Sequence, residues 1–325
     1  MKRKIFFLLL LLLLTQFFLW EETAMTYQNE SNQFKEEKMI QLEDLRWQNR
    51  IILVFTNENQ DNRELYEKFQ AQEVDIQTRH IRYFLFGKSV LSNSPERLDE
   101  QTVRELKDKY QSNENKTLIV LIGKDGAEKY RKTELDFEEI YRTIDAMPMR
   151  QQEMVQQKAS EKMLIDFTNA EETGTWWIIN DGVMGGRSQS EIRLTDDGTA
   201  LFQGNVSLEN YGGFASTRTN PRSFQLDNYQ GLLIRVKGDG KKYQLRLHTD
   251  NRFDGIAYRT YFQTQPATWL TIRTPFGEFV PVFRGRIMNN VSPISPEKIQ
   301  QIGLMISDKQ DGPFRLEIDS IRTYQ

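Results

Sequence analysis

The segment with the clearest chemical potential is a loop in the second half of the chain, Asp181-Gly182-Val183-Met184-Gly185-Gly186-Arg187, followed by Ser188. The adjacent glycines allow backbone amides to approach a partner or the chain to bend tightly. Asp181 and Arg187 could then hold a polar ligand, with the arginine forming two parallel hydrogen bonds. The alternative is a bulge and turn that only shapes the domain, with Asp181 and Arg187 paired to each other.

A second group of polar and aromatic residues lies further along the same half of the chain. Arginine and tyrosine side chains in this combination suit the binding of a sugar or of a protein. His248 beside Asp250 is interpreted as an exposed pair rather than a catalytic dyad. The candidate residues for ligand or partner binding are Asp181, Gly185, Gly186, Arg187, Ser188, Tyr211, Arg218, Arg246 and Arg284.

Residues 250–255 raise the question of a calcium site. Asp250 and Asp254 stand at loop positions one and five, and an EF-hand also needs an oxygen ligand at position three and a glutamate at position twelve. Those positions hold Arg252 and Tyr261, which excludes an EF-hand. A looser calcium site with Asp250 and Asp254 stays open beside the simpler interpretation, an ordinary turn between strands.

No catalytic residue is predicted. Residues 186–190 lack the second glycine of the nucleophile elbow, and residues 238–243 lack the third glycine of a dinucleotide-binding loop. Asp181 and Glu191 could form a carboxylate pair, but glycosidase carboxylates have no signature in sequence. An unrecognised hydrolase is therefore the enzymatic alternative to a protein that only binds.

Composition excludes several classes of chemistry. The 325 residues contain no cysteine, which removes disulfides, thiolate metal sites, cysteine nucleophiles and thiol redox chemistry. Only two histidines are present, which excludes a histidine-rich metal centre. The net charge of −3 gives no general field for nucleic acid. We therefore expect neither a cofactor nor a nucleic-acid partner.

The elements that would position these residues begin after an N-terminal segment typical of export. Lys2-Arg3-Lys4 precedes an apolar stretch over residues 5–20. As a helix it would span about 24 Å, short of a hydrocarbon core of about 30 Å. We expect residues 1–20 to be a signal peptide or a membrane anchor, with membrane association through residues 5–20. The body is then extracytoplasmic, periplasmic or secreted, after a polar spacer at 21–44 that is partly helical near 35–42.

An α/β domain is predicted over residues 45–147. Apolar runs at 51–55, 81–86 and 117–122 indicate buried strands, and a hairpin strand follows at 127–131. Apolar residues at helical spacing predict three helices: one that ends near residue 72, one at 95–110 and one at 137–144. The order βαβαββα is similar to a thioredoxin-like fold. Trp47-Gln48-Asn49-Arg50 and Leu121-Ile122-Gly123-Lys124-Asp125-Gly126 resemble the small bacterial family called domain of unknown function 4174.

Thioredoxin chemistry does not follow from that topology. A redox pair would stand at residues 56–59, and disulfide exchange needs thiolates, which the chain lacks. The domain is therefore expected to be a scaffold or interaction module, or to be purely structural.

A glutamine-rich linker at 148–162 leads into an all-β domain at 163–325. Tyr243, Leu245 and Leu247 alternate with polar residues, and this period of two indicates half-buried antiparallel strands. Many such strands with Gly/Asp/Asn turns indicate a sandwich or jelly roll. The tryptophans of this domain are expected in its core rather than as sugar platforms, namely Trp176, Trp177 and Trp269.

Four motifs of this domain carry a family resemblance. They are Trp177-Ile178-Ile179-Asn180-Asp181-Gly182-Val183-Met184-Gly185-Gly186-Arg187-Ser188, Asn210-Tyr211-Gly212-Gly213-Phe214-Ala215-Ser216-Thr217-Arg218, and the segments 233–243 and 279–286. Together they resemble the complex I intermediate-associated protein 30 family. The resemblance implies a galactose-binding-domain-like jelly roll and a role like that of the mitochondrial members, which are assembly factors for respiratory complex I. It supplies no catalytic residues.

We therefore expect an exported, non-enzymatic accessory protein that assists assembly or stability of an envelope or membrane protein complex. Its partner would be a protein. The alternative is a carbohydrate-binding module for envelope or extracellular glycans.

Overall fold

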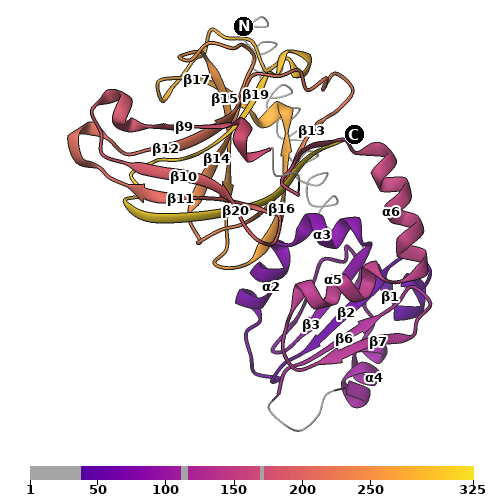
Figure 1. The fold of residues 1–325 in the computed structure, drawn as a ribbon. Coiled ribbons are helices and arrows are strands. Elements are labelled where there is room, and N and C mark those ends of the chain that lie inside the picture. Colours follow the sequence, from indigo (N-terminus) through magenta and orange to yellow (C-terminus); the bar gives the residue numbers. More distant parts are fainter. Residues whose placement is uncertain (1–37, 111–115, 169–171) are drawn as a thin grey trace, which may run out of the picture. The chain divides into compact units, whose positions relative to one another are not determined.

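The computed structural model describes residues 38–110, 116–168 and 172–325 (Figure 1). The chain divides into two compact units. The first contains the described residues up to 62 and residues 82–135, and the second contains residues 63–81 and 136–325. The predicted export segment and most of the predicted spacer lie outside the described residues.

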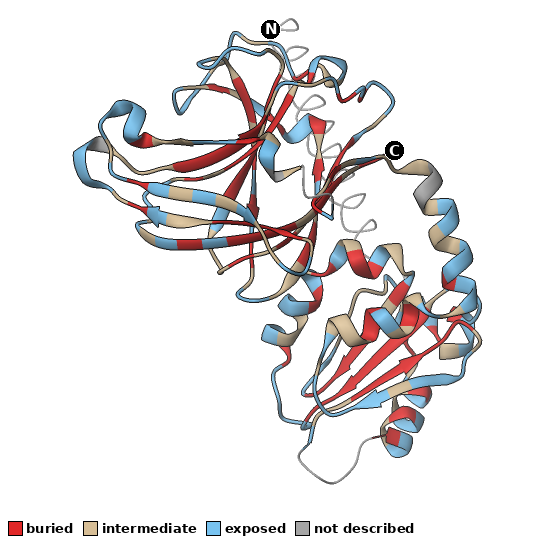
Figure 2. Ribbon diagram, viewed as in Figure 1, coloured by how far each residue is buried: buried red, intermediate tan, exposed pale blue. Residues whose placement is uncertain are grey.

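The first unit is built on a five-stranded sheet. Its strands, in spatial order, are β4 (Val90–Ser92), β3 (Ile81–Phe86), β2 (Arg50–Phe55), β6 (Leu118–Ile122) and β7 (Glu128–Lys132). Strands β2 and β6 are antiparallel, with Ile51 opposite Ile122. Every residue of β2 is buried (Figure 2), as its unbroken apolar run predicts.

Two segments of this unit differ from prediction. Helix α4 (Glu100–Tyr110) begins five residues later than expected, because β5 (Arg97–Leu98) instead pairs in parallel with β1 (Met39–Ile40). The expected helix near residues 35–42 is accordingly replaced in its described part by β1, followed by a 3-10 turn, η1 (Leu42–Leu45). Propensity alone could not reveal this pairing, since the two strands are far apart in sequence.

The loop after β2 is a hydrogen-bonded structural turn. The Thr56 hydroxyl donates to the Phe86 carbonyl at 2.9 Å and lies 3.1 Å from Oδ1 of Asn62. A Cβ at Gly87 would come within 2.6 Å of the Asn62 amide, so the loop packs against a backbone without a side chain. The segment that would carry a redox pair is thus occupied by neutral polar contacts. The thioredoxin-like assignment of this domain stays a prediction.

The second unit contains four helices, α2 (Arg63–Gln70), α3 (Glu73–Thr78), α5 (Phe137–Asp145) and α6 (Pro148–Ser160). Asp136 caps α5 by accepting a hydrogen bond from the Glu139 amide at 3.0 Å. The predicted linker is almost entirely the helix α6, which begins with proline at its first position, where the missing N–H costs nothing.

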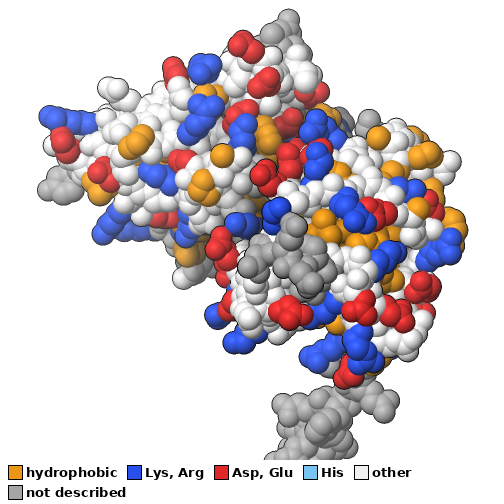
Figure 3. Space-filling view, turned by 90° about the horizontal axis from the view of Figure 1, so that it is seen from below, with side chains coloured by type: hydrophobic (Ala, Val, Ile, Leu, Met, Phe, Trp, Pro, Cys, Tyr) orange, Lys and Arg blue, Asp and Glu red, His pale blue; other side chains and the backbone are white. Residues whose placement is uncertain are grey.

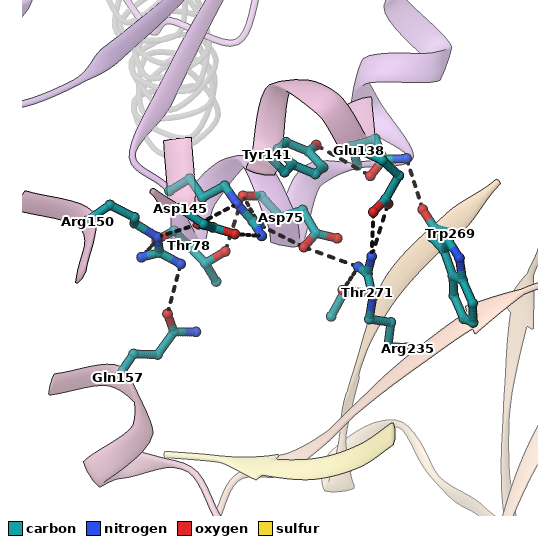
Figure 4. Close-up of polar contacts among 12 residues, drawn as sticks. Asp75, Thr78, Glu138, Tyr141, Asp145, Arg150, Gln157, Arg235, Trp269 and Thr271 are labelled. Carbon is teal, nitrogen blue, oxygen red and sulfur yellow. Dashed lines mark hydrogen bonds and ion pairs between the residues drawn. The ribbon is translucent and has the colours of Figure 1, made fainter. Parts of the chain in front are cut away.

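A polar network ties these helices together within the second unit (Figure 4). Arg150 of α6 bonds to Asp145 at 3.0 Å and to the Thr78 carbonyl at 2.7 Å. Arg235, from strand β13 (Gly231–Lys237), bonds to Glu138 of α5 at 3.0 Å. Through these charge-assisted hydrogen bonds, which are buried or half-buried, the helices of the unit are joined to one another and to β13.

The rest of the second unit is an antiparallel β-sandwich, which confirms the predicted class of residues 163–325. One sheet contains β10 (Gln189–Leu194), β11 (Ala200–Val206), β20 (Gly312–Tyr324), β13 and β16 (Trp269–Pro275), with β8 (Met163–Asp166) also pairing with β20. The other contains β18 (Arg286–Ile287), β17 (Val280–Phe283), β15 (Ala257–Gln263), β14 (Lys242–His248), β19 (Gln301–Ile306), β12 (Ala215–Thr219) and β9 (Trp176–Asn180).

Alternation along the strands builds the core between the two sheets. Tyr243, Leu245 and Leu247 of β14 are fully buried, and Phe202 packs edge-on against Phe314 with ring centroids 4.9 Å apart. Trp176 joins this core as predicted, with 7% of its surface exposed. Trp177, the next residue on β9, does not, because alternation turns it to the outer face of the sheet, where it lies opposite Arg218 and is 47% exposed. Trp269 is half-buried.

Two properties of the surface bear on partners. No helix among the described residues is both long and apolar enough to cross a membrane. On the face drawn in Figure 3, basic and acidic side chains are interspersed. This mixture agrees with the small net charge and differs from the basic stripe expected of a nucleic-acid-binding surface.

Candidate functional site

The Asp181 carboxylate is an internal anchor of its loop. It is fully buried and accepts hydrogen bonds from the amides of Ser188 at 2.9 Å, Gly213 at 2.7 Å and Phe214 at 3.3 Å, as well as from the Ser188 hydroxyl at 2.5 Å. Burial acts to raise the pKa of Asp181, but these hydrogen bonds outweigh it and hold the pKa below its usual value. The carboxylate therefore shapes the loop from inside.

The glycines of the loop make room for that carboxylate. A Cβ at Gly186 would lie 2.4 Å from the Asp181 carboxyl group, and one at Gly212 would lie 2.6 Å from it. Gly185 ends the 3-10 turn η3 (Asp181–Met184) at a φ of +89°, which favours glycine. Arg187 does not pair with Asp181, since it forms an exposed ion pair with Glu209 at 2.6 Å.

A cleft of the sandwich lies on the outer face of the seven-stranded sheet. It has a volume of about 690 Å³ and is lined by β12, β14, β15 and β19 together with the loops around residues 183 and 253. Arg246 lies opposite Arg259 on one side and Gly303 on the other, and Gly303 lies opposite Arg218. Residues in register share a face, so three arginines form one row across four strands, with a glycine in the gap. We call Arg218, Arg246 and Arg259 the arginine row.

Gly303 cannot easily be another residue. A Cβ there would lie 2.9 Å from both the Arg218 Cβ and the Thr217 carbonyl oxygen. Gly303 lets its strand lie close against β12 at this position. Arg246 and Arg218 stand on either side of this glycine, with backbones about 10 Å apart across two strand spacings. The floor of the cleft is thus cationic on both sides of Gly303.

The arginine row has neutral partners. Arg218 donates to the Phe253 carbonyl at 2.9 Å, and Arg246 contacts Oε1 of Gln244 at 3.3 Å and the sulfur of Met305 at 3.0 Å. The Nε atoms of Arg218 and Arg259 and Nδ1 of His248 are buried without a hydrogen-bond partner among the described residues. Arg218 and His248 are only 6% and 7% exposed.

The electrostatics of the cleft reflect this crowding of positive charge. Burial, reinforced by Arg259 and Arg218, lowers the pKa of Arg246 to about 10. Burial, reinforced by Arg218 and Arg246, lowers the pKa of His248 to about 3, so His248 is neutral at pH 7. Burial also lowers the pKa of Arg218, against an opposing influence of Asp250.

The rim of the cleft combines apolar and ion-paired side chains. Val183, Met184 and Phe253 line it and are 63%, 62% and 58% exposed. Arg284 also lines the rim and pairs with Asp254, with 3.2 Å between its Nε and the carboxylate. Exposed apolar groups gathered at a polar cleft are typical of an interaction surface.

The structure distributes the predicted site residues unevenly. Arg218 and Arg246 meet in the cleft, and Arg284 stands at its rim. Tyr211 lies at the end of the 3-10 turn η4 (Glu209–Tyr211). Sequence reasoning missed Arg259, whose place beside Arg246 depends on the β14–β15 register. Outside the cleft lining stand Asp181, Gly185, Gly186, Arg187 and Ser188.

The calcium candidates are both occupied by arginines. Asp250 accepts hydrogen bonds from the Arg252 guanidinium at 2.6 and 2.8 Å, and Asp254 pairs with Arg284. Within the described part of the chain, no three carboxylate or histidine side chains gather in a way that could hold a metal ion. The segment is an arginine-bridged turn in this structure.

Two family models match parts of this chain. The model of the family "Complex I intermediate-associated protein 30" matches residues 165–318, and that of "Domain of unknown function (DUF4174)" matches residues 41–153. Both halves of the chain match known families. The two resemblances predicted from the sequence motifs are therefore confirmed, and the cleft lies within the first of these matches.

The relatives are similar over only part of their length. Mitochondrial complex I intermediate-associated protein 30 of Mus musculus is 27% identical over 61% of this chain and 65% of its own length. Its Drosophila melanogaster counterpart is 26% identical over 54% of this chain and 71% of its own. A family 11 carbohydrate-binding module of Clostridium thermocellum, solved with a mixed-linked tetrasaccharide, is 18% identical with a TM-score of 0.40, covering 50% of this chain and 95% of that one. A likeness this weak carries no argument about ligands.

The prediction of a periplasmic or secreted location is wrong. The relatives are named as mitochondrial proteins, not as periplasmic or secreted ones. The prediction relied on the basic and apolar pattern of residues 2–20 alone. Such a pattern describes a targeting segment and contains no information from the folded body, on which the relationship is based.

Proposed function

We propose that this protein is a non-enzymatic accessory factor that binds a protein partner during assembly of a multi-subunit complex. The relatives that match its sandwich domain are named for association with intermediates of complex I, which supports an assembly role. The observation that carries the proposal is the cleft, where Val183, Met184 and Phe253 expose apolar surface around a floor of arginines. Methionine, aromatic and arginine side chains are the types enriched in protein interfaces.

The proposal is tested by capturing partners with the full chain as bait from solubilised membranes of the source cells. The variant pair V183S/M184S removes apolar surface at the rim, and V155S is the matched control, because Val155 lies on α6 and is 71% exposed. We expect the unmodified chain and V155S to retain one stoichiometric partner belonging to a larger complex, and the rim variant to lose it. Absence of such a partner, or equal retention by all three chains, would refute the proposal.

A second candidate function is glycan binding. Trp177 of β9 lies opposite Arg218, on the outer face of the seven-stranded sheet, and its ring is 47% exposed. An exposed indole beside arginine gives an apolar surface with polar groups at its edge, which suits a sugar as well as a protein. A glycan array probed with the unmodified chain and with W177A separates the two functions. Binding of a neutral glycan that W177A abolishes would favour this candidate.

A further inference from the structure

The arginine row poses an electrostatic problem that the described residues do not solve. Arg246 and Arg259 lie directly opposite each other on neighbouring strands, where side chains are about 5 Å apart at Cβ and like charges are unfavourable. The nearby carboxylates have other partners. Asp250 is bonded to Arg252, and Asp254 is bonded to Arg284.

A third carboxylate, Asp308, does not neutralise the row either. It is exposed at the rim of the cleft, where its oxygen lies 3.5 Å from the Tyr261 hydroxyl and 3.2 Å from the Ser307 hydroxyl. The three guanidinium groups therefore face a cleft with donors to spare, including the buried Nε atoms of Arg218 and Arg259. The complementary ligand is an anion with paired oxygens.

We propose that the arginine row binds carboxylate side chains of an acidic segment of the protein partner. That the partner is a protein rests on the proposed function. That it presents carboxylates rests on the residues of the cleft. A guanidinium presents a planar fork of donors that matches a carboxylate, and Arg246 and Arg218 stand on either side of Gly303 in a cleft of about 690 Å³ that can admit the acid. Val183 and Met184 at the rim would then pack against apolar side chains flanking the acidic residues.

The direct test is fluorescence anisotropy of the full chain with a fluorescein-labelled hexaglutamate peptide. We compare the unmodified chain with R246Q, R218Q and R193Q. Arg193 is the matched control, because it lies on β10 of the other sheet with its side chain 54% exposed and loses the same charge. We expect R246Q and R218Q each to weaken binding about tenfold or more, and R193Q to change it less than about twofold, since a distant exposed charge is screened by salt.

Salt and competing ligands complete the test. Binding should weaken as ionic strength rises, and an unlabelled hexaglutamate peptide should compete while cellohexaose should not. R246Q is the variant least prone to misfold, because the hydrogen bonds of Arg246 within the described part of the chain go to the neutral side chains of Gln244 and Met305, and its replacement deprives no acid of its partner. Absence of peptide binding, or equal weakening in R193Q, would overturn the inference. Direct binding of labelled oligogalacturonate by a chain that does not bind the peptide would overturn it in favour of an acidic glycan.

The experiments distinguish a failure of this inference from a failure of the proposed function. A stoichiometric partner that is retained by R246Q and at high salt would support the assembly role and refute the acidic segment. Peptide binding that depends on Arg246, without any stoichiometric partner of the full chain, would refute the assembly role and leave the carboxylate site standing.

Discussion

Replacing Arg246 by glutamine should make the unliganded protein more stable while weakening its binding of anions. Most substitutions of a half-buried residue destabilise a protein. We expect Arg246 to be an exception. It is a desolvated cation beside Arg259 and Arg218, and its own hydrogen bonds are made to neutral groups. Glutamine keeps a polar amide near Gln244 and removes the charge.

The expected size follows from the pKa of Arg246. Its environment lowers that pKa to about 10, well below the ordinary range of a guanidinium. Each pKa unit corresponds to about 1.4 kcal/mol between the two protonation states, so a shift of two units or more costs the charged form about 3 kcal/mol before screening is considered. The side chain is only half-buried, and screening by water and salt reduces the figure, so we expect a gain of about 1 kcal/mol in the free energy of unfolding.

Urea unfolding at pH 7 and low ionic strength measures this change, with R193Q as the control for loss of a positive charge elsewhere. For R246Q we expect a higher urea midpoint at an unchanged slope, and for R193Q no measurable change, because Arg193 is exposed. The gain should shrink as salt rises, since screening relieves the repulsion in the unmodified chain. A lower midpoint for R246Q would show that the arginine row is neutralised within the protein, and would refute the reasoning.

Three further perturbations test the rest of the site. His248 stays neutral when folded because its pKa is lowered to about 3. The stability that depends on it is therefore complete above about pH 6.5 and falls as pH drops toward 3, by up to about 1.4 kcal/mol per pH unit. H248Q should flatten that decline in urea unfolding at pH 7 and 5, and an unchanged decline would contradict the burial of this imidazole. D181N should lower the free energy of unfolding by about 3 kcal/mol, because buried amides lose a charged acceptor. R187Q should lower it by less than about 1 kcal/mol, because Arg187 is exposed. Equal effects of the two variants would contradict the role of Asp181 as the buried anchor of its loop. G303A should cost about 1 to 3 kcal/mol by thermal unfolding, since its methyl group meets atoms of β12 at 2.9 Å, and a neutral result would show that the strands can separate there.

The sequence predicts the strands of this protein better than the arrangement of its site. Period-two alternation places Tyr243, Leu245 and Leu247 on the core face of β14, and the structure buries all three. The same alternation places Arg246 on the opposite face. Which segments form strands, and on which face of the sheet each side chain lies, depend on the local sequence, so a single sequence can specify them.

The row itself is a property of strand register. Arg259 becomes a neighbour of Arg246 only because β14 and β15 pair at that register, and Arg218 joins them only through β19. Register depends on turn lengths and on the packing of the whole sheet, which one sequence does not reveal. Conversely, Asp181 looks functional in the sequence because it is charged and flanked by glycines, whereas the glycines serve its burial.

Asp181 and the arginine row differ in how their buried charges are hydrogen-bonded. Asp181 is buried, but backbone amides and the Ser188 hydroxyl satisfy it completely, so its charge stabilises one loop conformation. Arg218 is buried to nearly the same degree, yet its Nε has no hydrogen-bond partner among residues 38–110, 116–168 and 172–325, and burial lowers its pKa. A buried charge that is satisfied contributes to the fold, whereas one left unsatisfied reduces stability until something binds it. The cleft is therefore a better candidate for a binding site than the loop. Charge and glycine content do not decide this; the decisive difference is whether the buried charge already has hydrogen-bond partners in the protein.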